Sequence, residues 1–177
     1  MPRKLRVKPL PNPFHVVLVE PEIPQNTGNI ARLCAATQSH LHLCGPLGFR
    51  IDEKSVRRAG VDYWHLVSLH VHPDFETFTA KNPDARVRLF SANGGRSYLE
   101  AGLQAGDALV FGKESAGLPR ALLDRYPGEI YGIPTSGAVR SLNLSSAAAI
   151  IVYEGLRASG GMDNAWLEGD EGTDFVK

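Results

Sequence analysis

The sequence predicts an α/β fold with a mainly parallel sheet and helices on both faces. Apolar runs of strand length alternate with helical patterns along the chain, which is the order typical of such sheets. The first run, residues 14–19 (FHVVLV), is continuously apolar and rich in β-branched residues, as strands buried on both faces are. Three later strands end in glycine-containing loops, and parallel sheets bind ligands at such loops.

The length and composition indicate one domain. A chain of 177 residues with 43% hydrophobic and 21% charged residues suits a single well-buried core. We expect the domain to span residues 14–160, after a flexible basic arm (1–13) and before an acidic, disordered tail (161–177). From Gly161 onward there are five acids and one base, so residues 1–160 carry 18 bases and 14 acids. This basic surplus permits RNA binding without demanding it.

The sequence gives no sign of a membrane or a secretory route. It contains no apolar run long enough to cross a bilayer, and its basic N-terminus lacks the apolar core of a signal peptide. Cys34 and Cys44 are too few for a disulfide framework, and each lies in an apolar segment. We therefore expect a cytoplasmic protein that makes no membrane contact.

The elements of the first half follow from local patterns. Residues 26–38 (NTGNIARLCAATQ) predict a helix that Asn26 or Thr27 can cap. Its buried stripe, at helical spacing, is Ile30, Leu33, Cys34 and Thr37. Residues 40–44 predict a second strand, and residues 52–60 (DEKSVRRAG) predict a short helix with acids in its first turn.

The second half continues the alternation. Residues 66–72 predict a strand, and Pro73 opens a short helix that includes Phe75 and Phe78. Further strands are predicted at residues 87–92, 107–112 and 129–133, and further helices at residues 118–126 and 142–158.

The most informative stretch is residues 133–154 (IPTSGAVRSLNLSSAAAIIVYE), in which a polar loop enters a helix. Residues 144–153 carry no charge, so we expect this helix to be buried on all sides, against its own core and against a second subunit. Either Ser141 or Asn143 can cap the helix, and the same residues can face a ligand. Both interpretations remain open on the pattern alone.

Three loops at predicted strand ends are candidate ligand sites: residues 92–96, 112–118 and 134–140. No G-x-G-x-x-G motif follows any strand, and Gly112-Lys113 lacks the spacing of a P-loop. Dinucleotide binding and nucleoside triphosphate hydrolysis are therefore disfavoured.

Three segments together go beyond generic α/β chemistry. They are residues 21–34 (PEIPQNTGNIARLC), residues 109–119 (LVFGKESAGLP) and the stretch 133–154. In this order and spacing they resemble the three signature motifs of the SPOUT superfamily of RNA methyltransferases. The nearest members are the minimal bacterial enzymes that methylate the ribose 2′-hydroxyl of the tRNA wobble nucleotide. The resemblance covers residues 14–157.

The resemblance implies a C-terminal trefoil knot, a homodimer, and S-adenosylmethionine held in the knot loops, with the tRNA anticodon loop as substrate. Such enzymes hold the cofactor largely through backbone groups. The positions here that match those contacts are Ala92, Gly112, Ile133, Ser141, Leu142 and Asn143. Small residues suit this role because they let the backbone close around a ligand.

Arg32 is the catalytic residue that the resemblance implies, since the family pattern places this arginine at the target nucleotide. A guanidinium stays protonated in proteins, so we do not expect it to act as a base. We expect it to clamp a phosphate or the hydroxyl oxygen and to stabilise developing negative charge, while an RNA phosphate or a water takes the proton. The competing interpretation is an arginine that is merely solvated.

Other motif residues have less specific predictions. The family counterpart of Glu114 organises the knot loop, and Tyr153 either stacks on a base or packs at the dimer interface. Arg140 and Lys113 are candidates for RNA phosphate contacts. The chain departs from the family pattern at Ala116, where an arginine is usual, and at Ala138-Val139, where an Asn-Ser pair is common.

Two further functions and one further site are weighed. Ribosomal RNA is an alternative substrate, and a non-catalytic dimeric RNA-binding module is an alternative to an enzyme. His40 and His42 on one predicted strand, and His70 and His72 on another, each share a face, which invites a metal interpretation. We expect no metal, because nothing else in the chain demands one and histidines at strand ends are commonly exposed.

Overall fold

The computed structural model describes residues 3–50 and 64–169. Its main sheet has seven strands in the order β4-β3-β2-β7-β5-β8-β6, and each neighbouring pair is parallel. The strands are β2 (His15–Val19), β3 (His40–Cys44), β4 (Ser68–His72), β5 (Val87–Phe90), β6 (Arg96–Ser97), β7 (Ala108–Phe111) and β8 (Ile130–Gly132). The predicted parallel α/β sheet is thus confirmed.

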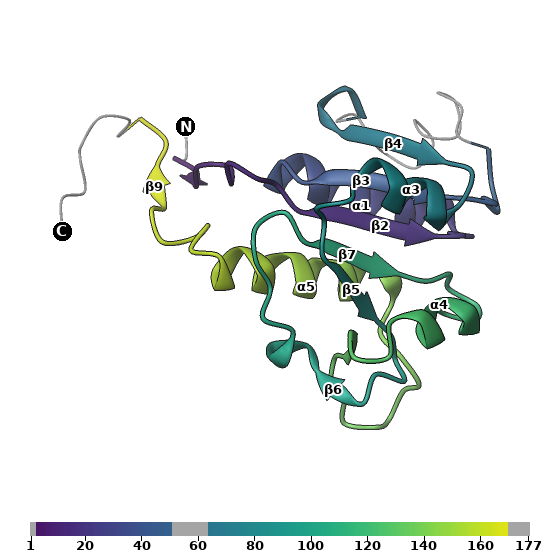
Figure 1. Cartoon of the computed structure of the whole chain (residues 1–177). Coiled ribbons are helices and arrows are strands. Elements are labelled where there is room, and N and C mark those ends of the chain that lie inside the picture. Colours follow the sequence, from purple (N-terminus) through teal and green to yellow (C-terminus); the bar gives the residue numbers. More distant parts are fainter. Residues whose placement is uncertain (1–2, 51–63, 170–177) are drawn as a thin grey trace.

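Helices cover both faces of this sheet, as predicted (Figure 1). They are α1 (Pro24–Thr37), α3 (Phe75–Lys81), α4 (Arg120–Arg125) and α5 (Leu144–Ala158), with short 3-10 turns η1 (Trp64–Leu66) and η2 (Tyr98–Glu100). Helices α1 and α5 pack on one face and on each other, while α3 and α4 pack on the other face. The helix predicted at residues 52–60 lies outside the described residues.

The core follows from strand alternation. Val16, Leu18 and Leu109 face α1 and α5, whereas Val17 and Val110 face α3 and α4, and all five are fully buried. Burial of both strand faces explains why these strands are continuously apolar in sequence. None of the helices in the described part of the chain is both long and apolar enough to cross a membrane.

One helix prediction needs correction. Helix α1 begins at Pro24 and has Ile23 as its N-cap residue, so neither Asn26 nor Thr27 caps it. Helix α5 was expected to be buried against its own core and a second subunit, and within one chain it exposes the stripe Ser146, Ile150, Tyr153 and Arg157. Ile150 and Tyr153 are 37% and 47% exposed. Burial of this stripe therefore requires a surface from outside the chain.

The first and last strands of the described chain pair with each other. β1 (Leu5–Arg6) pairs antiparallel with β9 (Trp166–Leu167), next to the chain ends in Figure 1. A salt bridge of 3.0 Å joins Arg6 Nη2 to Glu168 Oε1. Residues of the expected basic arm and acidic tail are thus paired with each other by backbone bonds and opposite charges.

Five histidines gather on the α3 side of strands β2, β3 and β4, and we call them the histidine cluster: His15, His40, His42, His70 and His72. His42 and His72 are buried, so the expectation of exposed histidines is wrong for these two. Among the described residues, no three histidine, cysteine or acidic side chains are arranged to hold a metal ion.

Candidate functional site

A pocket of about 600 Å³ opens at the carboxyl ends of β5, β7 and β8. Its walls are the three loops that the sequence predicted. The main contributors are Ser91, Ala92 and Asn93 after β5, residues 112–117 after β7, and Ile133, Thr135 and residues 140–144 after β8. Its volume falls within the range of small-molecule and cofactor sites.

The floor of the pocket is aromatic. Phe90, Phe111 and Tyr131 line it from the ends of the three strands, and the rings of Phe90 and Phe111 stack with centroids 5.3 Å apart. Burial, and then the neighbouring Glu129, raise the pKa of Tyr131, so its hydroxyl stays protonated at neutral pH. Such a floor offers flat apolar surface to a planar ligand.

The Glu114 carboxylate holds the pocket loops together. It accepts hydrogen bonds from the backbone N–H groups of Glu22 (2.8 Å) and Ile23 (3.2 Å) and from Asn26 Nδ2 (3.0 Å). Asn26 Oδ1 in turn accepts a bond of 3.0 Å from Asn143 Nδ2. One polar chain therefore links all three sequence motifs and satisfies backbone donors ahead of α1.

Asn143 also begins helix α5. Its Oδ1 accepts from the backbone N–H of Ser145 (2.9 Å) and Ser146 (3.4 Å), so Asn143, and not Ser141, is the N-cap. The two interpretations of Asn143 are thus compatible, because one side chain caps the helix and lines the pocket.

Two more polar contacts tie the loop after β7 to the segment before α1. Lys113 Nζ lies 2.9 Å from Glu20 Oε2, and this bond raises the pKa of Lys113. Ser115 donates to Glu22 through its backbone N–H and its hydroxyl, which lowers the pKa of Glu22. The charge of Lys113 is therefore already matched by a carboxylate.

Glycines let the loop backbones approach closely. A Cβ on Gly112 would overlap the backbone of Gly117 and Leu118, and one on Gly94 would overlap Tyr131 and Gly132. Any side chain at Gly112 or Gly94 would thus push the loop away from its strand. The cradle around the pocket depends on these two positions.

The structure brings together most of the predicted site residues. The pocket is lined by Ala92, Gly112, Lys113, Ile133, Arg140, Ser141, Leu142 and Asn143. Ala116, where the chain departs from the family pattern, also lines it. Arg32 does not: it lies on the exposed stripe of α1, with Gln25, Asn29 and Ala36. Its catalytic role stays a prediction.

Sequence reasoning missed two contributions to the pocket. Asn26 was interpreted as a helix cap, although its side chain bonds to Glu114 and Asn143. The aromatic floor was not recognised, although Phe90 and Phe111 lie two residues and one residue before a predicted ligand loop. Ligands bind beyond the carboxyl ends of parallel strands, so the position of these aromatic residues at strand ends was the available signal.

The pocket is built to bind more than to exchange protons. Its ionisable lining residues in the described chain are Lys113, Glu114, Tyr131 and Arg140. Lys113 and Glu114 are held by protein partners, and Tyr131 bonds to Glu129. Such a site suits the binding and positioning of a ligand.

Comparison with known proteins agrees with this geometry. The model of the SpoU rRNA methylase family matches residues 13–153, which include all three pocket loops and α1. The chain belongs to the SpoU rRNA methylase family. The predicted membership of this class of RNA methyltransferases is thereby confirmed.

Relatives within the SpoU family match over nearly their whole length. The tRNA (cytidine(34)-2′-O)-methyltransferase of Burkholderia cenocepacia (strain HI2424) is 47% identical over 150 residues, which are 83% of this chain and 96% of the relative. The protein of the same name from Saccharophagus degradans is 43% identical over 148 residues, again 83% and 96% of the two chains.

Solved SpoU-type structures share the fold. One, from work on the 2-OH methylation of C/U34 on tRNA, has a TM-score of 0.79 and 47% identity, and the match covers 84% of this chain and 97% of that one. An AdoMet-bound rRNA methyltransferase from Sinorhizobium meliloti has a TM-score of 0.72 and 25% identity, and the match covers 86% of this chain and 61% of that one.

Proposed function

We propose that this protein transfers a methyl group from S-adenosylmethionine to the ribose 2′-hydroxyl of the wobble nucleotide, position 34, in tRNA anticodons. The observation that carries the proposal is the near-complete match to relatives named for this reaction, together with a pocket built by all three motifs. Ribosomal RNA is the weaker alternative, because the rRNA enzyme of similar fold is longer and only 25% identical.

The pocket fits S-adenosylmethionine. Its aromatic floor suits the adenine, and the glycine-dependent cradle brings the backbone of Ala92, Gly112 and Ile133 to the pocket wall, where it can bond to the cofactor. The segment Ser141, Leu142 and Asn143 forms the opposite wall. When bound, this cofactor supplies a methyl group on a sulfonium, which is activated toward a nucleophile without acid catalysis.

Arg32 is the residue proposed to act on the ribose. The hydroxyl is a weak nucleophile, so it must be held in line with the methyl group while its proton leaves. Arg32 clamps a phosphate or the hydroxyl oxygen and stabilises the developing negative charge, and an RNA phosphate or a water takes the proton. It can do so on RNA that extends beyond the pocket of its own chain.

A homodimer forms part of the proposal. The exposed stripe on α5 contains Ile150 and Tyr153, and it lies on a helix that packs on α1, the helix of Arg32. A second copy seated on this stripe buries it and brings the Arg32 of one chain toward the pocket of the other. Ile150→Asp and Tyr153→Asp should yield monomers in light scattering, whereas dimers in both variants would contradict this interface.

RNA contacts are proposed for Arg140 and, more weakly, for Lys113. Within residues 3–50 and 64–169, Arg140 has no ion-pair partner, whereas Lys113 is paired with Glu20. With Ala116 and Ala138-Val139 in place of the usual polar residues, Arg140 carries more of the phosphate binding at the pocket mouth. A tRNA substrate also makes the cytoplasm the expected place of action.

The trefoil knot and the 14–160 domain boundaries also remain proposals. The family match at residues 13–153 supports a domain of about this extent.

Calorimetry with S-adenosylmethionine and a methyl-transfer assay on tRNA test the proposal together. We expect stoichiometric binding and transfer, and Arg32→Ala should lower the transfer rate at least about 100-fold while leaving cofactor binding intact. An absence of cofactor binding would refute both enzyme alternatives in favour of a non-catalytic RNA-binding module. An undiminished Arg32→Ala rate would refute the role given to Arg32.

A further inference from the structure

The wall of the pocket formed by Ser91, Ala92 and Asn93 is attached to the sheet by a very small strand. These residues lead into β6, which is last in the strand order of the sheet. β6 pairs with β8 through two residue pairs, Arg96 with Tyr131 and Ser97 with Gly132. So short an edge strand has few backbone bonds, so side chains must help to hold it.

The loop of residues 91–94 packs so closely against β8 that it leaves no room for a larger residue at Gly94. The backbone N–H of Ser91 donates to Tyr131 O at 2.9 Å, and the N–H of Gly94 donates to Ser91 O at 3.0 Å. A Cβ on Gly94 would overlap the β8 backbone. A small shift of β6 would therefore displace Ala92 and Asn93 from their place in the pocket wall.

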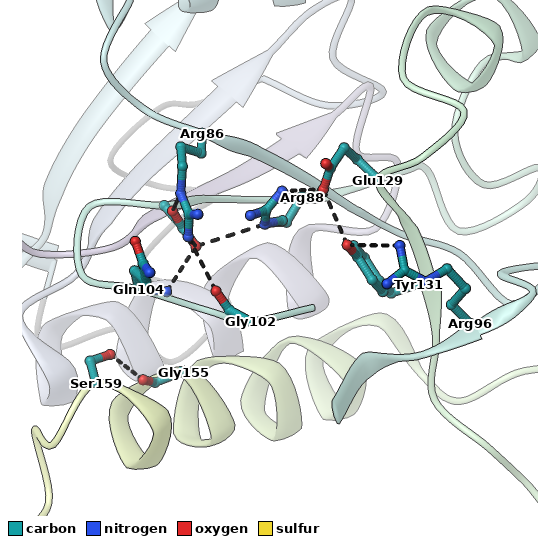
Figure 2. Close-up of polar contacts among 10 residues, drawn as sticks. Arg86, Arg88, Arg96, Gly102, Gln104, Glu129, Tyr131, Gly155 and Ser159 are labelled. Atoms are coloured by element: carbon teal, nitrogen blue, oxygen red, sulfur yellow. Dashed lines mark hydrogen bonds and ion pairs between the residues drawn. The ribbon is translucent and has the colours of Figure 1, made fainter. Parts of the chain in front are cut away.

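Arg96 fastens this strand to β8. Its Nη1 donates to Gly128 O at 3.0 Å, and its guanidinium carbon lies 5.0 Å from the centre of the Tyr131 ring. A longer contact of 3.5 Å reaches Tyr131 Oη, as Figure 2 shows, and Glu100 lies 3.7 Å away. The cation over the ring and the bond to Gly128 are the stronger contacts.

A charged network also holds the hydroxyl of Tyr131 (Figure 2). Tyr131 Oη donates to Glu129 at 3.2 Å, and Glu129 pairs with Arg88. Arg88 lies 3.9 Å from Asp107, a buried carboxylate that accepts two bonds of 2.8 Å from Arg86. Tyr131 therefore has a fixed position, and Arg96 fastens the loop to a rigid residue.

We propose that Arg96 is a positioning residue for the cofactor pocket. It does not line the pocket, but it holds the loop of Ala92 and Asn93 against Tyr131, and all three of these residues do line it. The inference rests on the proposed function, because Arg96 is taken to hold in place the pocket wall that binds S-adenosylmethionine. Loss of Arg96 then weakens cofactor binding more than it affects tRNA binding or the chemical step.

The chain offers a closely matched control. Arg125 also lies over a tyrosine ring, that of Tyr126 at 5.5 Å, and pairs with a carboxylate, that of Glu76 at 3.5 Å. Its side chain is 51% exposed against 50% for Arg96, and it does not line the pocket. Arg125→Ala therefore removes similar contacts at a site remote from the loop.

Steady-state kinetics on purified Arg96→Ala and Arg125→Ala test the inference. Arg96→Ala should raise the KM for S-adenosylmethionine about 5- to 10-fold, with kcat and the KM for tRNA changed less than about twofold. Arg125→Ala should leave all three constants near those of the wild type. Arg96→Lys keeps a cation over the ring but loses the planar fork, so it should recover part of the rise.

An unchanged KM for S-adenosylmethionine in Arg96→Ala would overturn the inference. This holds even if the melting temperature of Arg96→Ala falls as much as that of Arg125→Ala, because a loss of stability alone is not a positioning effect. Should Arg96→Ala fail to fold, Arg96→Gln is neutral and keeps part of the unbranched stem, and the same KM decides the matter. A wild-type protein that binds no S-adenosylmethionine would instead refute the proposed function itself. The two failures are thus distinguishable.

Discussion

At the carboxyl ends of β5, β7 and β8, polar side chains bond to loop backbones and leave a cavity between them. On β2, β3 and β4, three imidazoles of the histidine cluster (His15, His42 and His72) bond to one another and fill the space beside Phe78 of α3. Glu114 serves two backbone N–H groups, whereas His42 lies 2.9 Å from His15 and 3.0 Å from His72, ring nitrogen to ring nitrogen. One region is arranged to receive a ligand, and the other is closed.

The hydrogen bonds of the histidine cluster favour neutral rings. A neutral imidazole has one donor and one acceptor, so His15, His42 and His72 can form an ordered chain. Nδ1 of His72 is buried and has no partner among the described residues. The tautomer with the lower free-energy cost leaves Nδ1 of His72 unprotonated, as an acceptor without a donor. Its Nε2 is then protonated and donates to His42. Burial, and then neighbouring histidines, lower the pKa of His15 to about 4 and of His42 to about 2.

The largest expected effect is a loss of stability in acid, caused by the histidine cluster. Between pH 6.5 and 4 these histidines bind protons in the unfolded chain but stay neutral in the folded cluster. The free energy of unfolding should therefore fall as the pH drops. From pH 7.5 to 5.0, His15 and His42 together should cost about 2 to 3 kcal/mol, measured by urea unfolding, because solvent screens the half-buried His15. His15→Gln should reduce this loss, whereas His65→Gln, an exposed histidine outside the cluster, should not. Equal stability at the two pH values would contradict the account.

The next effect concerns the ligand region. Glu114→Gln removes the charge from an acceptor of three hydrogen bonds, so the segment before α1 and the loop after β7 should separate. We expect an affinity for S-adenosylmethionine about 10- to 30-fold weaker, measured by calorimetry. Glu76→Gln, an acidic side chain on α3, is the control and should bind normally. An unaltered affinity in Glu114→Gln would show that the polar chain does not shape the pocket.

A smaller effect separates the two roles of Asn143. Asn143→Ala loses both the helix cap and the bond to Asn26, and should lower the free energy of unfolding by about 1 kcal/mol or slightly more. Asn143→Ser keeps a good cap but cannot reach Asn26, so it should recover stability and still bind the cofactor more weakly. If Asn143→Ser restored both properties, Asn143 would be a cap alone.

The smallest effect is expected at Lys113. Its pair with Glu20 is about 30% exposed on both sides, at 31% and 28%, so Lys113→Ala should change the free energy of unfolding by less than about 1 kcal/mol. Its effect on tRNA affinity should also be smaller than that of Arg140→Ala, because Glu20 already neutralises the charge. A filter-binding titration that ranked Lys113 above Arg140 would reverse this assignment.

The comparison also shows where sequence reasoning reaches its limit. Local signals located six of the seven strands of the main sheet and the three loops, because two-sided burial leaves continuous apolar runs such as residues 14–19 and because glycines mark close backbone approach. They could not show that Asn26 bonds to Glu114, since that partner is 88 residues away. Nor could they bury His42, whose environment depends on β2 and β4 lying on either side of β3.

Helix α5 shows a different limit. Its uncharged sequence indicated burial on every side, yet one chain covers only the side of Ala148, Ile151 and Val152. An uncharged helix sequence indicates that the helix surface is buried. It does not indicate whether the same chain or another molecule buries it. Arg32 is a similar case, because its motif predicts a role while the structure of one chain places it outside the pocket.

The central claim is that the three-loop pocket directs a methyl group to one ribose hydroxyl. The most direct test incubates the protein with S-adenosylmethionine and tRNA, and maps the methylated nucleotide by nuclease digestion and mass spectrometry. A matched tRNA with a 2′-deoxyribose at position 34 is the control. The account predicts a 2′-O-methyl group at position 34 and none on the deoxy control. A methyl group on a base, or at another position in both RNAs, would contradict it.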